Sequence, residues 1–141
     1  MTTPAIITVA VTGAVPTTAD NPAVPVTPER QIESAVEAFH AGATVCHLHV
    51  RDEHERPSSD PKRYQAVREG IEETCPEMIV QFSTGARGRT VEERFSCLDL
   101  RPEMASFSTG SVNFPTGIYD NPPDVVEDKA RQILDLGIKP E

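Results

Sequence analysis

The sequence predicts an α/β protein that forms the N-terminal half of a (β/α)8 TIM barrel, with parallel strands and alternating helices. Three observations support this prediction. Strand-like and helix-like segments alternate along all 141 residues. Each helix-like segment opens on a capping residue, in three cases followed by proline, and polar residues occur where the strands end. Such alternation is typical of parallel strands joined by right-handed crossovers.

Five segments rich in apolar and β-branched residues are predicted to be strands. They cover residues 6–12, 45–50, 78–83, 104–108 and 138–141. A complete barrel of this type takes roughly 250 residues, and the last segment is only the opening of a fifth strand. Residues 1–141 are therefore expected to form a single partial barrel domain, truncated at the start of strand five.

Four intervening segments carry helix-start signals, in which a side-chain oxygen can accept from a free backbone N–H of the first turn. The signals are Thr27-Pro28, Asp60-Pro61, the capping box Thr90-x-x-Glu93 and Asn121-Pro122. Glycines at 42 and 137 end the first and fourth helices. Apolar residues recur at three and four positions, so each helix is expected to bury one face. On the fourth helix this face consists of Val126, Ala130, Ile133 and Leu134.

A doubly wound open sheet would show the same alternation of strands and helices. The barrel is favoured because polar side chains occur at the ends of the first four strands, where the loops of a barrel gather around one mouth. These side chains belong to Thr12, His47, His49, Ser83, Ser106 and Ser108. The mouth of the barrel is therefore the expected functional site.

The second predicted strand contains the motif His47-Leu48-His49. Successive side chains of a strand point to opposite faces, so the two histidines share one face and Cys46 lies on the other. Two imidazoles at this spacing suit a divalent metal such as zinc, which binds histidine nitrogen at about 2.0–2.1 Å. From the motif alone, two core or solvent-facing histidines without a metal are equally compatible.

Composition excludes several classes of protein. The formal net charge of −9 argues against a nucleic-acid surface, which needs clustered lysine and arginine. No apolar run is long enough for a membrane span, and the start of the chain has no secretory signal, so a cytoplasmic protein without membrane contact is expected. Three cysteines without close spacing indicate buried thiols rather than a disulfide framework.

Several motifs together resemble the β-keto acid cleavage enzymes, among them the 3-keto-5-aminohexanoate cleavage enzyme of lysine fermentation. In chain order they are V-T-G-A (11–14), D-N-P (20–22), V-T-P-E (26–29), H-L-H-V-R (47–51), Q-F-S-T-G (81–85), P-E-M-A-S (102–106) and G-S-V-N-F (110–114). The resemblance extends over essentially the whole chain and covers the N-terminal half of the family's barrel.

The resemblance implies a zinc-dependent acyltransferase, in full length usually a homotetramer, that converts a β-keto acid and acetyl-CoA to acetoacetate and a new acyl-CoA. His47 and His49 match two zinc ligands of the family. The positions that match its substrate pocket are Ser83, Gly85, Ser106 and Ser108. The third zinc ligand, a glutamate, and the proton-transfer arginine and aspartate are expected beyond Glu141, so this chain alone is expected to be an inactive fragment.

Taken without the resemblance, each of these serines is equally compatible with a strand-end hydroxyl bonded to neighbouring backbone. Val15 stands where the aminohexanoate enzyme has a glutamate that helps to hold the substrate amine, so a neutral or differently polar β-keto acid is expected instead of a cationic one. Arg87 and Arg89 lie in a glycine-containing loop that could receive a carboxylate or a CoA phosphate, although exposed arginines are more often simply solvated.

Two other functions fit the same features. One is a metal-dependent hydrolase of the amidohydrolase type, also a barrel with an H-x-H motif, although there the pair usually lies on the first strand. The other is a non-catalytic half-barrel that assembles with a partner. Assays with β-keto acids and acetyl-CoA would distinguish the three.

Overall fold

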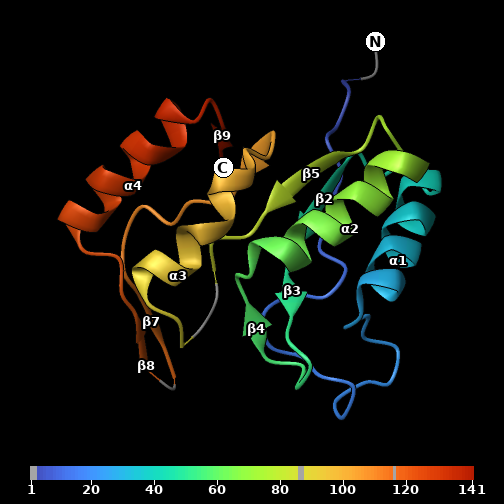
Figure 1. Cartoon of the computed structure of the whole chain (residues 1–141), viewed down its shortest axis with the longest axis horizontal. Helices are drawn as coiled ribbons and strands as arrows, with labels where there is room; N and C mark the ends of the chain where they lie inside the picture. Colours follow the sequence, from blue (N-terminus) through green and yellow to red (C-terminus); the bar gives the residue numbers. More distant parts are fainter. Residues whose placement is uncertain (1–2, 86–87, 116) are drawn as a thin grey trace.

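The computed structural model of the chain describes residues 3–85, 88–115 and 117–141 (Figure 1). Five strands form one parallel sheet. Their order across the sheet is the same as their order along the chain, so each strand pairs with the next of the five. In order across the sheet they are β1 (Thr8–Val9), β2 (Val45–Leu48), β5 (Ile79–Phe82), β6 (Met104–Ala105) and β9 (Lys139–Pro140).

Helices connect these strands. They are α1 (Pro28–His40), α2 (Pro61–Thr74), α3 (Val91–Phe95), which continues as a 3-10 helix (Ser96–Leu100), and α4 (Pro123–Asp135). Because neighbouring strands are consecutive, right-handed crossovers put all connecting helices on one face, whereas a doubly wound sheet would reverse its strand order. The predicted α/β fold, the first half of a (β/α)8 barrel, is confirmed. None of the described helices is long and apolar enough to cross a membrane.

The helix starts follow the sequence signals in three of four cases. Thr27, Asp60 and Thr90 are N-caps, and each accepts a hydrogen bond from a backbone N–H of the first turn. The capping box is complete: Thr90 Oγ1 accepts from the Glu93 N–H at 3.2 Å, and the Glu93 carboxylate accepts from the Thr90 N–H at 2.8 Å. These local bonds fix where the helices begin without help from the rest of the chain.

The register between β2 and β5 separates two faces of the sheet. Leu48 lies beside Phe82, and both are fully buried against the helices. The preceding residues of each strand, His47 and Gln81, also lie side by side. By alternation they point to the other face, which is the interior of a barrel.

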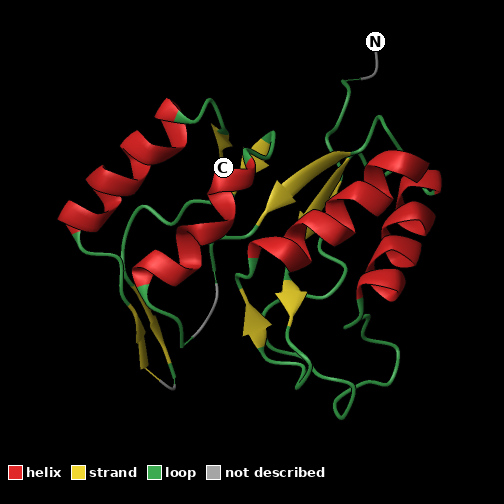
Figure 2. Cartoon of the chain, in the orientation of Figure 1, coloured by secondary structure: helices red, strands yellow, loops and turns green. Residues whose placement is uncertain are grey.

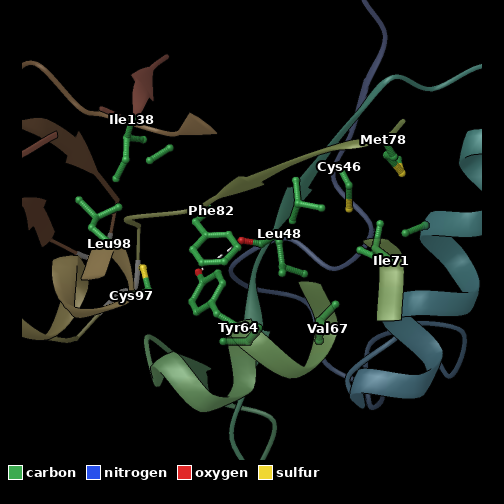
Figure 3. Close-up of a cluster of buried hydrophobic side chains, with 14 of the residues drawn as sticks. Cys46, Leu48, Tyr64, Val67, Ile71, Met78, Phe82, Cys97, Leu98 and Ile138 are labelled. Atoms are coloured by element: carbon green, nitrogen blue, oxygen red, sulfur yellow. Dashed lines mark hydrogen bonds between the residues drawn. The ribbon is translucent and has the colours of Figure 1, made fainter. Parts of the chain in front are cut away.

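The hydrophobic core lies between the sheet and the helices that cover one of its faces (Figure 3). Tyr64 of α2 packs its ring against Phe82, with the ring centroids 4.5 Å apart. The three cysteines are free and buried, as predicted. Cys46 belongs to this core, and burial raises the pKa of its thiol to about 12, so it is a packing residue and not a partner of the histidines.

Helices α1 and α2 approach closely at Gly70. A Cβ atom added to Gly70 would lie 2.3 Å from Cδ1 and 2.9 Å from Cγ1 of Ile32. Glycine in the middle of a helix costs about 1 kcal/mol relative to alanine, and here the missing side chain makes room for the neighbouring helix.

The first predicted strand is wrong in length and burial. Residues 6–12 were expected to form a buried strand, but only Thr8–Val9 pair with β2. Ile6 and Ile7 are 82% and 53% exposed. The physical reason is that β1 lies at an edge of the described sheet, so its apolar side chains are covered from one side only.

The fourth helix also differs from the prediction. Its N-cap is Pro122, which has no side-chain capping bond, while Asn121 is buried and uses its amide in contacts to other segments. On the predicted apolar face only Ile133 is fully buried, and Leu134 is 65% exposed. This helix covers the edge strand β9, so it has less of the sheet to pack against.

Two antiparallel hairpins replace loops of the prediction. One pairs β3 (Val50–Arg51) with β4 (Pro57–Ser58), and the other pairs β7 (Val112–Phe114) with β8 (Gly117–Tyr119). Both lie at the end of the molecule opposite the N-terminus (Figure 2). They follow β2 and β6, so they flank the carboxyl end of the parallel sheet.

We predict that Tyr64→Phe destabilises the chain by about 1–2 kcal/mol in denaturant unfolding. The Tyr64 hydroxyl donates to the backbone oxygens of Ser83 at 2.8 Å and Leu48 at 3.3 Å and so ties α2 to the ends of β5 and β2. Thr74→Val is the control, because it removes an exposed hydroxyl that bonds to the Gly70 carbonyl of its own helix. Equal stability of the two variants would contradict the prediction.

Candidate active site

A pocket of about 250 Å³ opens at the carboxyl end of the parallel sheet. Its lining brings together all six residues that the sequence predicted for metal and substrate, which are His47, His49, Ser83, Gly85, Ser106 and Ser108. Ala14, Phe114 and Tyr119 complete the lining. Residues far apart in the sequence therefore meet at one mouth, while their roles remain predictions.

The two histidines face each other through one nitrogen each. His47 belongs to β2, whereas His49 follows the end of that strand and lies in no regular element. Their Nε2 atoms are 3.1 Å apart, and the rings meet edge to face. Two Zn–N bonds of about 2.0–2.1 Å at a tetrahedral angle would separate two nitrogens by about 3.3 Å. The pair is thus close to the spacing that a bound zinc ion requires.

His49 is neutral over the physiological range. Burial, the neighbouring His47 and the positive charge of Arg51 lower its pKa to about 4. A neutral imidazole is the form that binds a metal. Among the described residues, no group of three His, Cys, Asp or Glu side chains is placed to hold a metal ion, so the pair offers two ligands.

The backbone of His49 is held by a side chain that the sequence analysis missed. Gln31 of α1 is almost fully buried, and its Nε2 donates to the carbonyl oxygen of His49 at 2.6 Å and to Thr12 Oγ1 at 2.7 Å. Thr12 in turn donates to the carbonyl oxygen of Pro25 at 2.8 Å. Thr12 was expected at the end of the first strand, but it lies three residues beyond β1 and outside the pocket lining, where it bonds to the backbone behind the pocket.

The side chain of His47 is held by a second missed residue. Gln81 Oε1 is hydrogen-bonded to His47 Nδ1, and Gln81 Nε2 donates to Glu141 Oε2 at 2.6 Å. Gln81 is fully buried in an otherwise apolar strand. A lone amide in such a strand was the available sequence signal, but its partners lie 34 and 60 positions away.

The serines of the pocket make backbone and side-chain bonds and still have hydrogens to offer. Ser83 Oγ accepts from the Gly85 N–H and Ser106 Oγ accepts from the Thr84 N–H, each at 3.1 Å. A hydroxyl has one donor and two acceptor positions, so in these contacts both hydrogens can still be donated to a bound molecule. The backbone contacts expected for strand-end hydroxyls are therefore present and do not exclude substrate binding.

The β7–β8 hairpin supplies an aromatic wall. Phe114 and Tyr119 have ring centroids 6.4 Å apart, and the Arg94 guanidinium lies 4.3 Å from the centroid of Tyr119. Arg94 is buried; its Nε donates to the Thr84 carbonyl at 3.1 Å and its Nη2 to Asn121 Oδ1 at 2.7 Å. Burial raises the pKa of Tyr119. The charge of Arg94 and a hydrogen bond with Ser108 act to lower this pKa, but the effect of burial is larger. The hairpin is thereby fixed to the loop after β5.

Three residues of the sequence analysis lie outside the pocket lining or the described chain. Val15 is 58% exposed, and its neighbour Ala14 lines the pocket instead. None of the described lining residues carries a carboxylate. Arg87 lies outside the described residues. Arg89 donates to the Pro57 carbonyl at 3.2–3.3 Å and lines a different hollow from the histidine pocket.

The fold and the site define a class of protein. A chain of consecutive parallel β/α units with polar side chains at the carboxyl ends of its strands has the arrangement of (β/α)8 barrel enzymes. The chain belongs to the beta-keto acid cleavage enzyme family, whose model matches residues 4–141. This membership supports the predicted family over the amidohydrolase alternative.

Curated relatives carry several substrate names. The chain is 55% identical over 141 residues to the 3-oxoadipate:acetyl-CoA acetyltransferase of Cupriavidus necator, covering 100% of this chain and 50% of that protein. It is 41% identical over 138 residues to the 3-keto-5-aminohexanoate cleavage enzyme of Fusobacterium nucleatum, covering 96% and 51%. The chain thus spans about half the length of the curated relatives it matches.

Solved structures of ObcA show the same fold. The ternary complex of ObcA with a C4-CoA adduct and oxalate matches at a TM-score of 0.76 and 29% identity, covering 85% of this chain and 31% of that one. The binary complex of ObcA with oxaloacetate matches at a TM-score of 0.75 and 28% identity, covering 84% and 30%.

We predict that Arg94→Met lowers the free energy of unfolding by about 2–3 kcal/mol, because it removes a buried charged donor from Thr84 and Asn121. The β7–β8 hairpin should also become cleavable in limited proteolysis at residues 112–119. Arg131→Met is the matched control, since Arg131 is exposed and forms an ion pair with Glu127 on its own helix. A hairpin equally resistant in both variants would refute the role of Arg94.

Proposed function

We propose that this chain is the metal- and substrate-binding half of an acyltransferase that converts a 3-oxo dicarboxylic acid of the 3-oxoadipate type and acetyl-CoA to acetoacetate and a new acyl-CoA. The observation that supports the proposal is the pocket in which the histidine pair meets three serine hydroxyls at the mouth of the half-barrel. Family membership supports the reaction class.

Charge and the relatives support this choice of substrate. Ser83 and Ser106 can donate hydrogen bonds, which suits a substrate carboxylate or keto oxygen. A cationic amino-keto acid would need a negative partner, and the described lining offers none. The relative with 55% identity is named for 3-oxoadipate, a keto acid with a second carboxylate. An anionic substrate therefore fits better than the amine of the aminohexanoate enzymes.

The chemistry balances without another reactant. A proton leaves C2 of the keto acid, between its ketone and its carboxylate. C2 then forms a bond to the acetyl carbonyl carbon and CoA leaves as thiolate, after which the thiolate attacks C3 and the C2–C3 bond breaks. When the C2–C3 bond breaks, its electron pair stays on C2, which takes back a proton. C1 and C2 thereby become part of acetoacetate, and the remaining four carbons of 3-oxoadipate become the new acyl-CoA. The groups that move the proton are expected beyond Glu141.

Residues of this chain would bind and orient the substrate. His47 and His49 would hold a zinc ion, which when bound supplies Lewis-acid stabilisation of the enolate charge. A Cβ on Gly85 would lie 3.4 Å from Ser83 Oγ and 3.7 Å from the Tyr119 hydroxyl, so glycine there keeps room beside both hydroxyls. The rings of Phe114 and Tyr119 would exclude water from one side of the bound acid.

A chimera tests the function. Residues 1–141 are joined to the second half of the Cupriavidus necator relative, which this chain matches over 50% of its length. We expect acetoacetate to form from 3-oxoadipate and acetyl-CoA. The acetoacetate is measured through its reduction in a coupled enzyme assay. The aminohexanoate substrate should react at least tenfold more slowly, a difference of about 1.4 kcal/mol in transition-state binding.

Each half alone and the chimera with His47→Ala serve as controls and should be inactive. Hydrolysis of substrates without CoA would favour the amidohydrolase type of chemistry instead. A folded, zinc-loaded chimera that is silent with both keto acids would favour the non-catalytic half-barrel.

We predict that the 141-residue chain binds zinc weakly, because the histidine pair supplies two of the usual three or four protein ligands. In competition titrations with a chromogenic chelator, His47→Ala and His49→Ala should each reduce the affinity further. His54→Ala is the control, since His54 is an exposed histidine of the β3–β4 hairpin. Tight, stoichiometric zinc binding by the monomeric chain would contradict this prediction.

A further inference from the structure

Gln81 lies between His47 and the acidic side chain of Glu141 on the interior face of the sheet. Its Oε1 is bonded to His47 Nδ1, and its Nε2 donates to Glu141 Oε2 at 2.6 Å. We propose that Gln81, oriented by Glu141, is a positioning residue that fixes the Nδ1–H tautomer of His47 and so keeps the lone pair of Nε2 available to a metal. The proposal rests on the metal role of His47 proposed above.

The orientation of the Gln81 amide is set at its Glu141 end. An ionised carboxylate has no hydrogen to donate, so the side of the amide that meets Glu141 must be the NH2 group. The amide oxygen then necessarily points the other way, toward His47 Nδ1. A flipped amide would put two acceptors, Oε1 and the carboxylate, 2.6 Å apart.

The orientation of the amide determines the tautomer of His47. An amide oxygen only accepts hydrogen bonds, so His47 Nδ1 must carry the hydrogen. A neutral imidazole has one N–H, which leaves Nε2 as a bare acceptor. This Nε2 is the atom that faces His49 Nε2 at 3.1 Å, where a metal shared by the two histidines would be bound.

Burial and register make this arrangement specific. Gln81 is fully buried, so no water competes for its amide. The pairing of β2 with β5 sets Gln81 directly beside His47, and the β6–β9 pairing brings Glu141 to the same face of the sheet. Partners that orient a metal-binding histidine in this way typically contribute 10–100-fold to metal affinity.

The test measures the tautomer directly in the metal-free chain. In ¹⁵N-labelled histidine NMR, long-range ¹⁵N–¹H correlations distinguish the protonated ring nitrogen of His47 from the bare one. We expect Nδ1–H to dominate in the unchanged chain. In Gln81→Leu nothing accepts from Nδ1, so both tautomers should be populated and zinc affinity should fall about 10–100-fold.

Two further variants separate positioning from packing. In Glu141→Gln the new amide can donate or accept, so Gln81 is free to flip and the Nδ1–H tautomer should become less dominant. The double swap Gln81→Glu/Glu141→Gln places an acceptor beside His47 again and keeps the total charge. It should restore both the tautomer and the zinc affinity.

Gln65→Leu is the matched control, because Gln65 donates to Glu69 at 2.7 Å in the same kind of glutamine–glutamate pair on the exposed face of α2. It should change neither readout. An unchanged His47 tautomer in Gln81→Leu and Glu141→Gln, or a dominant Nε2–H in the unchanged chain, would overturn the proposal.

The outcome is independent of the proposed reaction. If the tautomer shifts as expected while the chimera shows no keto acid cleavage, the proposed function fails and the positioning role stands. If the chimera is active and the tautomer does not respond, the positioning role fails alone. If Gln81→Leu does not fold by circular dichroism, Glu141→Gln and the double swap still decide the question.

Discussion

The parallel pairing of β2 with β5 connects the stability of this chain with its site. In one register Leu48 and Phe82 are buried against α2, and His47 and Gln81 face the interior of the barrel. A shift of one residue would turn every side chain of a strand to the opposite face, placing the histidine in the apolar core. The free energy gained by burying the core side chains therefore also keeps the His47 imidazole at the mouth of the barrel.

Much of this arrangement is encoded locally and could be predicted. Alternation places Cys46 and His47 on opposite faces, and the capping signals at Thr27, Asp60 and Thr90 lie within the turn that they stabilise. The serines were found because the ends of parallel strands meet at one edge. Ser83 and Ser106 do line one pocket with the histidines.

The remaining features depend on contacts between distant segments. Asn121 was expected to cap α4 but bonds to Arg94, a partner 27 positions away. The β7–β8 hairpin pairs only three residues on each side, too few for a periodic signal. Gln81 and Gln31 look like ordinary amides in the sequence, and only the folded chain shows that they hold the two histidines from behind. Propensity and periodicity do not report such long-range contacts.

The clamp of Arg94 on Tyr119 has a consequence for how substrate range can change. The aromatic wall of the pocket belongs to a small hairpin with its own pairing, whereas the histidine pair belongs to the main sheet. Substitutions at Phe114 can therefore reshape the pocket without disturbing β2 or β5. A family whose relatives are named for different keto acids can in this way keep the sheet that carries the histidines while the hairpin varies.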